Sequence, residues 1–220
     1  MGDFGIEKMC YDMVVASMFK NKAVRINFDT PYLLNSGIES PLYIEAGALL
    51  SDFGVRGTVV SSLLFWVNDH CRKLNTTVDA IVGIAQGGIV WASSIANNKG
   101  LPLLYAFAKP KDHGLFNQIV GDIPFNGARV IVIDDAITTG YSALEVVKAL
   151  RIGKDGKKAN VIGVYSIFDW GFSQVNEKFV ELGIEKQSLV SVDTLIDYGA
   201  KNNYLKPKEV DKLSVFIPKF

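Results

Sequence analysis

The sequence predicts an α/β protein with a doubly wound, mainly parallel sheet and a small N-terminal hood. Two observations on the 220 residues support this fold class. From about residue 79 onward, short and almost continuously apolar segments alternate with segments of helical spacing, and strands buried on both faces have that apolar pattern. The composition, 49% hydrophobic and 21% charged, suits a folded chain and excludes disordered and fibrous classes.

The first 50 residues have a different pattern, which is typical of a cap on a sheet. Residues 3–20 place apolar side chains at helical spacing, and residues 23–28 alternate like a short strand. A turn-containing link, PYLLNSG, leads to a second short strand, PLYIEAG. We therefore expect a helix and hood over residues 1–50, followed by an α/β core with C-terminal helices over residues 51–220.

The core begins with a long amphipathic helix, from Asp52 as its N-cap to about Leu74. Five strand segments follow in order: DAIVGIA, LPLLYAFA, RVIVIDD, NVIGVYSIF and SLVSV. The helical segments among them are WASSIANN, TGYSALEVVKAL and SQVNEKFVELG. One long, polar segment, KPKDHGLFNQIVGDIPFNGA, interrupts the alternation, and its Gly and Pro content indicates a functional lid or a mobile surface loop.

Charge, cysteine content and hydropathy exclude several classes of protein. The 23 basic and 23 acidic side chains give a net charge of zero, so nothing global favours nucleic acid or an anionic membrane. No run of 18 apolar residues and no signal-peptide layout occurs. Cys10 and Cys71 form neither a disulfide framework nor a metal-binding spacing. We expect a cytoplasmic protein without nucleic-acid or membrane partners.

Two adjacent carboxylates end the strand RVIVIDD. Ligands of open parallel sheets bind beyond the carboxyl ends of the strands, so Asp134 and Asp135 stand at a binding position. Neighbouring strand residues point to opposite sides, so both acids serve one ligand only where the chain already turns. The free N–H groups, dipole and hydroxyls of the next helix start make an anion site. That site comprises Ile137, Thr138, Thr139, Gly140, Tyr141 and Ser142. A ligand with both a diol and a phosphate, such as ribose 5-phosphate, fits the two features together.

Simpler interpretations explain less of this string. A solvated Asp pair with a threonine N-cap accounts for the acids alone. A nucleotide-binding strand of the P-loop type is excluded because G-x-x-x-x-G-K-[ST] is absent. Dinucleotide binding is excluded because GIAQGG does not match G-x-G-x-x-G. In that second turn, Gly87 and Gly88 allow close backbone approach at a helix start. His70, late in a helix, is interpreted as structural or exposed.

The string of an apolar run, Asp-Asp, two residues, Thr-Thr-Gly, one residue and Ser resembles the signature of type I phosphoribosyltransferases, which use 5-phosphoribosyl 1-pyrophosphate. FAKPKDHGLFNQIVG is similar to the mobile loop of orotate phosphoribosyltransferases, whose usual form is R-K-x-x-K-x-H-G. VGIAQGGI resembles the pyrophosphate-side loop, NSGIESPLYIE the S-G-x-x-S-P-x-Y segment near the base, and IFDWGF an F-x-Y-G-F segment. The resemblance covers about residues 30–200 in the same order and is closest to the orotate phosphoribosyltransferases.

This resemblance implies transfer of a phosphoribosyl group to orotate, giving orotidine 5′-monophosphate and pyrophosphate in pyrimidine biosynthesis. It implies Mg²⁺ as cofactor, held mainly by the ligand and not directly by the protein. The implied catalytic residues are Lys109, Lys111, His113, Asp134 and Asp135, and pyrophosphate would lie against Gln86, Gly87, Lys109, Lys111 and His113. It also implies a homodimer in which loop 109–118 acts across the interface.

The base site implied by the resemblance comprises Asn35, Ser36, Gly37, Tyr43 and Trp170. Trp170 and Phe172 follow a strand end, where aromatic rings can stack on a flat base. Packing beneath the C-terminal helices explains the same two rings equally well, so both interpretations stay open.

Three positions depart from the family pattern. Phe107 and Ala108 replace an Arg-Lys pair, and Gly47 replaces an arginine, the usual bidentate partner of a carboxylate or pyrophosphate. Three hypotheses follow: an orotate phosphoribosyltransferase in which Lys22, Arg25 or another cation substitutes, a transferase for an uncharged nucleobase, or a non-catalytic regulator that binds the phosphoribosyl ligand. Lys111 and His113 argue against the regulator, because a sensor has less need of them.

Overall fold

The computed structural model describes residues 3–34, 36–109 and 118–216, with the side chains of residues 3–10 left aside. A six-stranded sheet with the order β10-β9-β8-β5-β6-β7 forms its centre. Its strands are β5 (Ala80–Ile84), β6 (Leu103–Ala106), β7 (Ile119–Val120), β8 (Ala128–Ile137), β9 (Ala159–Asp169) and β10 (Glu185–Ser191). All neighbours pair in parallel except β6 and β7. The predicted mainly parallel, doubly wound sheet is therefore confirmed.

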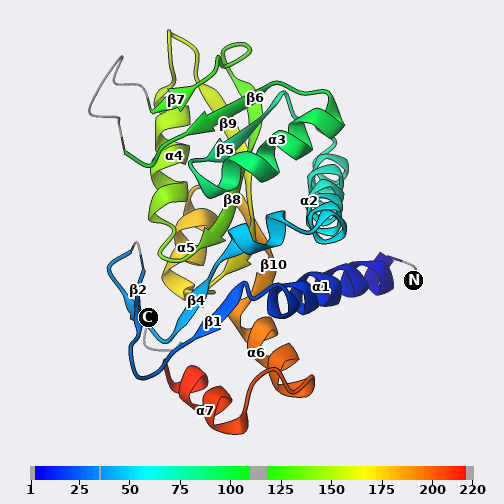
Figure 1. The fold of residues 1–220 in the computed structure, drawn as a ribbon. Helices are drawn as coiled ribbons and strands as arrows, with labels where there is room; N and C mark the ends of the chain where they lie inside the picture. The colour runs from blue at the N-terminus through cyan, green and yellow to red at the C-terminus, as the bar shows by residue number, and fades with distance from the viewer. Residues whose placement is uncertain (1–2, 35, 110–117, 217–220) are drawn as a thin grey trace.

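Helices cover both faces of this sheet, as Figure 1 shows. On one face lie α1 (Asp3–Lys20), α2 (Phe53–Lys73) and α3 (Gly87–Lys99), and on the other lie α4 (Tyr141–Ile152) and α5 (Ser173–Glu181). The chain ends in α6 (Val192–Lys201) and α7 (Pro207–Phe216). The predicted N-cap of α2 is confirmed, because the Asp52 carboxylate accepts the Val55 N–H at 3.0 Å.

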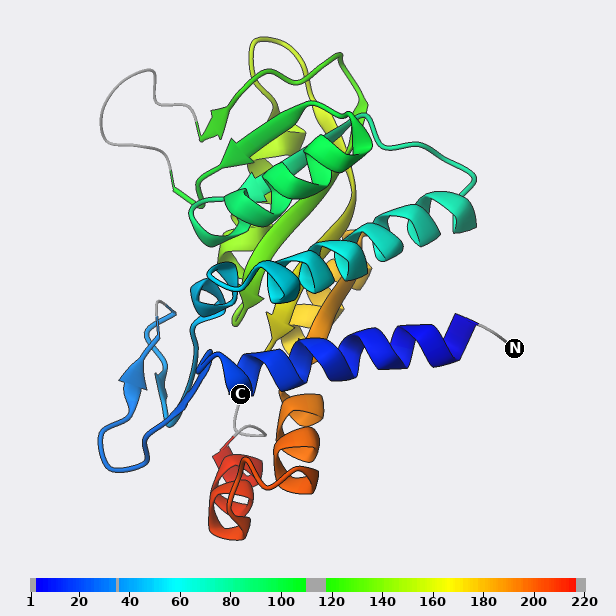
Figure 2. The same cartoon turned by 45° about the vertical axis from the view of Figure 1, so that its right-hand side comes forward.

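The hood consists of two antiparallel ribbons beyond the carboxyl ends of the central strands (Figures 1 and 2). One pairs β1 (Val24–Ile26) with β4 (Leu42–Ile44), and the other pairs β2 (Tyr32–Leu33) with β3 (Glu39–Ser40). The second ribbon lies partly where we predicted only a turn-containing link. Strands of two residues are too short to leave an alternating pattern in the sequence. A short 3₁₀ helix, η1 (Ala46–Leu50), connects the hood to α2.

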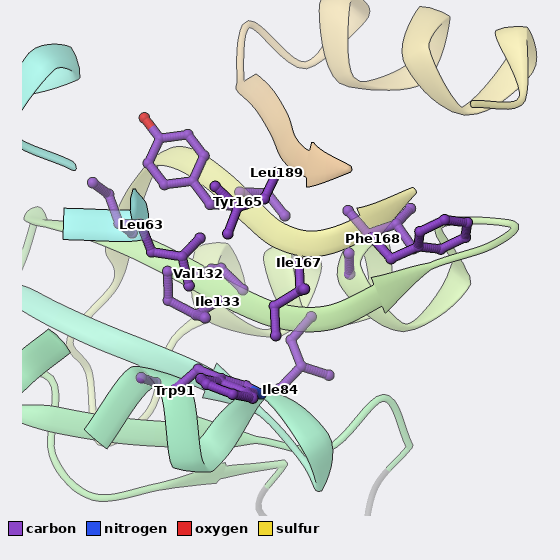
Figure 3. Packing of buried hydrophobic residues seen from close by; sticks show 14 of the residues in the cluster. Leu63, Ile84, Trp91, Val132, Ile133, Tyr165, Ile167, Phe168 and Leu189 are labelled. Carbon is purple, nitrogen blue, oxygen red and sulfur yellow. The ribbon is translucent and has the colours of Figure 1, made fainter. Parts of the chain in front are cut away.

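The core lies between the sheet and its helices. Figure 3 shows Trp91 of α3 beside Ile84, with Val132 and Ile133 of β8 and Ile167 of β9 in the same cluster. The five residues of β5 are all buried, which explains why this strand reads as a continuous apolar run. None of the described helices is long and apolar enough to cross a membrane. The division at residue 50 stays a prediction, although α1 packs on α2 and β10 of the core.

The strand order reverses between β5 and β8. From β5 the chain moves to β6 on one side, and it later returns to add β8, β9 and β10 on the other side. A reversal of this kind opens a crevice at the carboxyl ends of the two strands, where ligands bind in open α/β sheets. The fold thus provides a binding position between the ends of β5 and β8.

Candidate active site

A cavity of about 780 Å³ lies at this reversal, beneath the hood. Its size falls within the range of about 300–1,000 Å³ that is usual for ligand pockets. The lining comes from the hood (Leu34, Ser36, Tyr43, Ile44), the end of β5 and its turn (Ile84, Ala85, Gln86, Gly87), the continuous segment Asp134, Asp135, Ala136, Ile137, Thr138, Thr139, Gly140, Tyr141, Ser142 and Ala143, and Trp170 after β9.

The acid pair lies in the floor of this cavity. Asp134 is only 5% exposed and Asp135 is half-buried, and both line the cavity although β8 continues to Ile137. The chain therefore has not left the strand at the acids, and their binding of one ligand stays a prediction. Each carboxylate instead lies back over the chain and accepts the next backbone N–H at 2.9 Å. Burial raises the pKa of the Asp134 carboxyl, and the nearby negative charge of Asp135 raises it further.

The next residues form the turn from β8 into α4. Thr138 and Thr139 are half-buried, and Gly140 has φ of 69°. A Cβ on Gly140 would also lie 2.7 Å from Val175 Cγ1, so both conformation and space require glycine there. The N-cap residue Gly140 has no side chain to cap α4, which leaves the first N–H groups of the helix available for an anion.

A second glycine turn, between β5 and α3, packs against the acid pair. A Cβ on Gly87 would lie 1.9 Å from Asp135 Oδ2, and one on Gly88 would lie 2.2 Å from the Ile133 carbonyl oxygen. The start of α3 therefore touches the end of β8 through backbone and carboxylate atoms. Gln86 is exposed beside this contact, and the Ala85–Gln86 peptide bond is cis. Both glycines thus serve a tight strand–helix turn, and the expected close approach of this backbone to a phosphate stays a prediction.

Of the expected base-binding residues, the described structure brings Ser36, Tyr43 and Trp170 to the cavity. Tyr43 also packs on Tyr32, with ring centroids 5.5 Å apart. Gly37 is exposed and does not line the cavity, and Asn35 lies outside the described residues.

Trp170 is packed against other rings, and its stacking on a base stays a prediction. Its side chain is only 3% exposed and contacts Phe168 and Phe172, which is the packing role. It nevertheless forms part of the cavity wall, which leaves the stacking role available.

The expected pyrophosphate cations are not seen in the cavity. Lys109 is exposed and does not line it, whereas Lys111 and His113 lie outside the described residues. Before this segment, the Gln118 amide donates to the carbonyl oxygens of Phe107 at 3.3 Å and Ala108 at 3.1 Å. Within the described part of the chain, the cavity lining contains two carboxylates and no Lys, Arg or His.

The two proposed substitutes for the arginine at position 47 also lie outside the lining. Lys22 is exposed in the loop before β1. Arg25 pairs with Tyr43 in the β1–β4 register, and its guanidinium lies 3.8 Å from Glu45. Gly47 itself is exposed, and a Cβ there would lie 3.2 Å from Glu45 Oε1.

His70 has the structural role that was one of its two interpretations. It is 3% exposed on α2, and its Nδ1 pairs with Glu185 of β10. Its ring lies edge-on to Tyr165, away from the cavity lining.

The sequence interpretation missed six cavity residues: Leu34, Ile44, Ile84, Ala85, Ala136 and Ala143. All six are apolar, and each adjoins a predicted position except Ile84, which lies two residues before Gln86. Their only signal was that adjacency, because apolar side chains at strand ends also suit a core. No group of three His, Cys, Asp or Glu side chains able to hold a metal occurs among the described residues.

Comparison with known proteins agrees with this geometry. Residues 56–196 match the model of the phosphoribosyl transferase domain family. The orotate phosphoribosyltransferase of Cytophaga hutchinsonii is 33% identical over 200 residues, which are 91% of each chain. The crystal structure of orotate phosphoribosyltransferase from Aeropyrum pernix is 27% identical with a TM-score of 0.66, over 84% of this chain and 97% of that one. Leishmania donovani UMP synthase, at 21% identity and a TM-score of 0.74, shares the fold over 95% of this chain, which spans 42% of that longer chain.

Proposed function

Because the chain belongs to the phosphoribosyl transferase family, we propose that it is an orotate phosphoribosyltransferase. It would transfer the phosphoribosyl group of 5-phosphoribosyl 1-pyrophosphate to orotate in pyrimidine biosynthesis. A bond forms between a ring nitrogen of orotate and the anomeric carbon, and the bond from that carbon to pyrophosphate breaks. The observation that carries this proposal is the buried acid pair beside an uncapped helix start in one cavity.

The acid pair and the helix start would hold the two ends of the ribose 5-phosphate. Asp134 and Asp135 would accept hydrogen bonds from the ribose hydroxyls, which relieves two carboxylates that have no described cation in the cavity. The N–H groups at the start of α4 and the hydroxyls of Thr138, Thr139 and Ser142 would bind the phosphate. A site with both features selects a sugar phosphate over a diol or an anion alone.

The leaving pyrophosphate would lie beside Gln86 and Gly87, where the start of α3 packs against the Asp135 carboxylate. It brings several negative charges that the described lining does not balance. We propose that Lys109, Lys111 and His113 supply the charge, with loop 109–118 acting across the interface of a homodimer. The family resemblance supports this assignment.

Mg²⁺ is the cofactor that fits these residues. Asp134 and Asp135 give the cavity an oxygen-lined, acidic floor, which suits a Mg²⁺ ion held mainly by the bound ligand and not directly by the protein. Bound together with the ligand, Mg²⁺ would neutralise charge on pyrophosphate. The protein's own part is to position the sugar and to stabilise positive charge that develops at the anomeric carbon.

The base would bind between the hood and the segment after β9. Tyr43 and Ser36 form one side and Trp170 the other, which suits a flat ring with polar edges. The carboxylate of orotate needs a cation or several donors, since an unpaired buried charge costs several kcal/mol. The absence of a described cation in the lining, together with Gly47, therefore favours one alternative: a transferase for an uncharged nucleobase.

A panel of bases separates these functions. The protein is mixed with 5-phosphoribosyl 1-pyrophosphate, Mg²⁺ and one base at a time, and loss of orotate absorbance or release of pyrophosphate is followed. We expect turnover with orotate. Turnover only with uracil or a purine would support the uncharged-base alternative. Ligand binding without turnover on any base would support a non-catalytic regulator. That alternative is considered because Phe107 and Ala108 replace the basic pair of the family pattern.

A further inference from the structure

A buried ion pair lies directly behind the cavity wall at Trp170. Asp169 is the last residue of β9 and Lys186 lies in β10, and each side chain is only 8% exposed. The second oxygen of the Asp169 carboxylate accepts the Gly171 N–H at 2.9 Å. One carboxylate therefore ties the neighbouring strand to the turn that follows Trp170.

Trp170, which lies between Asp169 and Gly171 in the chain, is fixed through both its backbone and its ring. Its N–H donates to the Ile137 carbonyl oxygen at 3.0 Å, so its backbone is fixed to the cavity segment of β8. After it, Gly171 has φ of 73°, and the chain leaves the sheet there. The ring contacts Phe168 at a centroid distance of 5.8 Å and Phe172 at 6.3 Å. The position of the ring thus depends on the conformation of residues 169–171.

We propose that Asp169 and Lys186 are positioning residues that set Trp170 for base recognition. This inference rests on the proposed function, since it assumes that a nucleobase lies against Trp170. A buried ion pair stabilises a fold little compared with apolar residues of the same size. Its specific effect here is geometric, because the carboxylate directs the Gly171 N–H and so fixes the turn. Lys186 does not line the cavity.

Two ligands report on the two halves of the cavity. Ribose 5-phosphate uses only the acid pair and the start of α4, whereas orotidine 5′-monophosphate also uses the base wall. Calorimetry would measure both dissociation constants for the wild type, Lys186→Met and Asp169→Asn. We expect about a tenfold loss of nucleotide affinity in each variant, a change equal to roughly 1.4 kcal/mol, with ribose 5-phosphate affinity within about twofold of wild type. Lys186→Arg should restore most of the nucleotide affinity.

Arg129→Met is the matched control. Arg129 pairs with Asp79 at the opposite, amino end of β8, at 2.9 Å. This variant should unfold at a lower temperature and leave the ratio of the two dissociation constants unchanged. An effect on the ratio in the control as large as in Lys186→Met would overturn the inference, because any weakening of the sheet would then suffice.

Should a single variant fail to fold, Asp169→Leu combined with Lys186→Met replaces the pair with apolar residues of similar size, which buried sites tolerate. It leaves the Gly171 N–H without its acceptor, so we expect the same selective loss. Equal losses for both ligands, or unchanged nucleotide affinity, would overturn the inference.

The wild type alone tests the proposed function: no preference for orotidine 5′-monophosphate over ribose 5-phosphate contradicts orotate as substrate. The ratio is then measured with uridine or adenosine 5′-monophosphate, and a wild type that binds no nucleotide overturns both proposals.

Discussion

Gly88 tests the contact between the start of α3 and the end of β8. A Cβ at this position would lie 2.2 Å from the Ile133 carbonyl oxygen and 3.1 Å from Asp134 Cα. Both atoms belong to the backbone of the central strand, so neither can rotate away. To reach 3.0 Å, below which real Cβ atoms essentially never lie, the start of α3 must retreat from β8 by at least 0.8 Å.

We expect Gly88→Ala to lower both stability and turnover. Forcing a methyl group into packed backbone costs about 1–3 kcal/mol. For a chain of this size, each kcal/mol lowers the melting temperature by roughly 2–4 °C. A displacement near 1 Å at a reacting centre can reduce the rate by about 100-fold. Because Gly87 moves with α3, the pyrophosphate side should be affected more than the ribose-phosphate side.

Gly57→Ala is the matched control for this substitution. Gly57 is exposed within α2, and nothing lies within 4 Å of its added Cβ. Alanine favours a helix interior by about 1 kcal/mol over glycine, so this variant should melt slightly higher and keep full activity.

Calorimetric melting gives the stability of the two variants. Steady-state kinetics with 5-phosphoribosyl 1-pyrophosphate, together with ribose 5-phosphate binding, gives the functional effect. A Gly88→Ala protein with wild-type melting temperature and wild-type kcat/KM would refute the argued contact between α3 and β8. Loss of stability with unchanged kcat/KM would leave the contact between α3 and β8 standing and would refute only the role of that contact in positioning the glycine turn between β5 and α3.

Three further predictions concern the acid pair, the loop and the core. The pKa of Asp134 is raised in the folded protein, so its contribution to stability is present below the ordinary pKa of 3.8 and is lost as the pH rises through the folded value. Asp134→Asn should therefore be more stable than the wild type at neutral pH but bind ribose 5-phosphate less tightly, and urea unfolding across pH should show the gain vanishing in acid; a pH-independent difference would contradict the assignment. Lys111→Ala should lower turnover far more than ribose 5-phosphate affinity, and parallel losses in the two assays would remove its proposed role at pyrophosphate. Tyr165→Phe removes a buried hydroxyl that has no hydrogen-bond partner among the described residues, so urea unfolding should show a stability equal to or about 1 kcal/mol above wild type, whereas a loss of 2 kcal/mol would indicate a bridging partner.

The regular core could be predicted from sequence because its strands are buried on both faces. The run around Val82 and the run ending at Asp134 each appear as uninterrupted apolar stretches, and the structure has strands in both places. The Asp52 cap was equally visible, since one side chain meets one N–H three residues later.

Local sequence could not predict features that depend on distant parts of the chain. The two-residue strand β7 pairs antiparallel with β6 at the sheet edge, and its pattern was lost within a long polar segment. Local sequence also did not predict that Asp134 and Asp135 line one cavity while both still lie in β8. The alternation of side chains along a strand takes no account of carboxylates that lie back over their own backbone. The ion pair beside Trp170 joins Asp169 to Lys186 of another strand, which no short motif reveals.

The cavity draws ten consecutive residues, Asp134 to Ala143, from the end of β8, the following turn and the start of α4, and its remaining walls come from three separate places in the chain. Mutation can therefore change the hood or the segment at Trp170 and leave the proposed ribose 5-phosphate site unaltered. A division of this kind would allow base specificity to change by mutation without a change in the residues proposed to bind the phosphoribosyl donor.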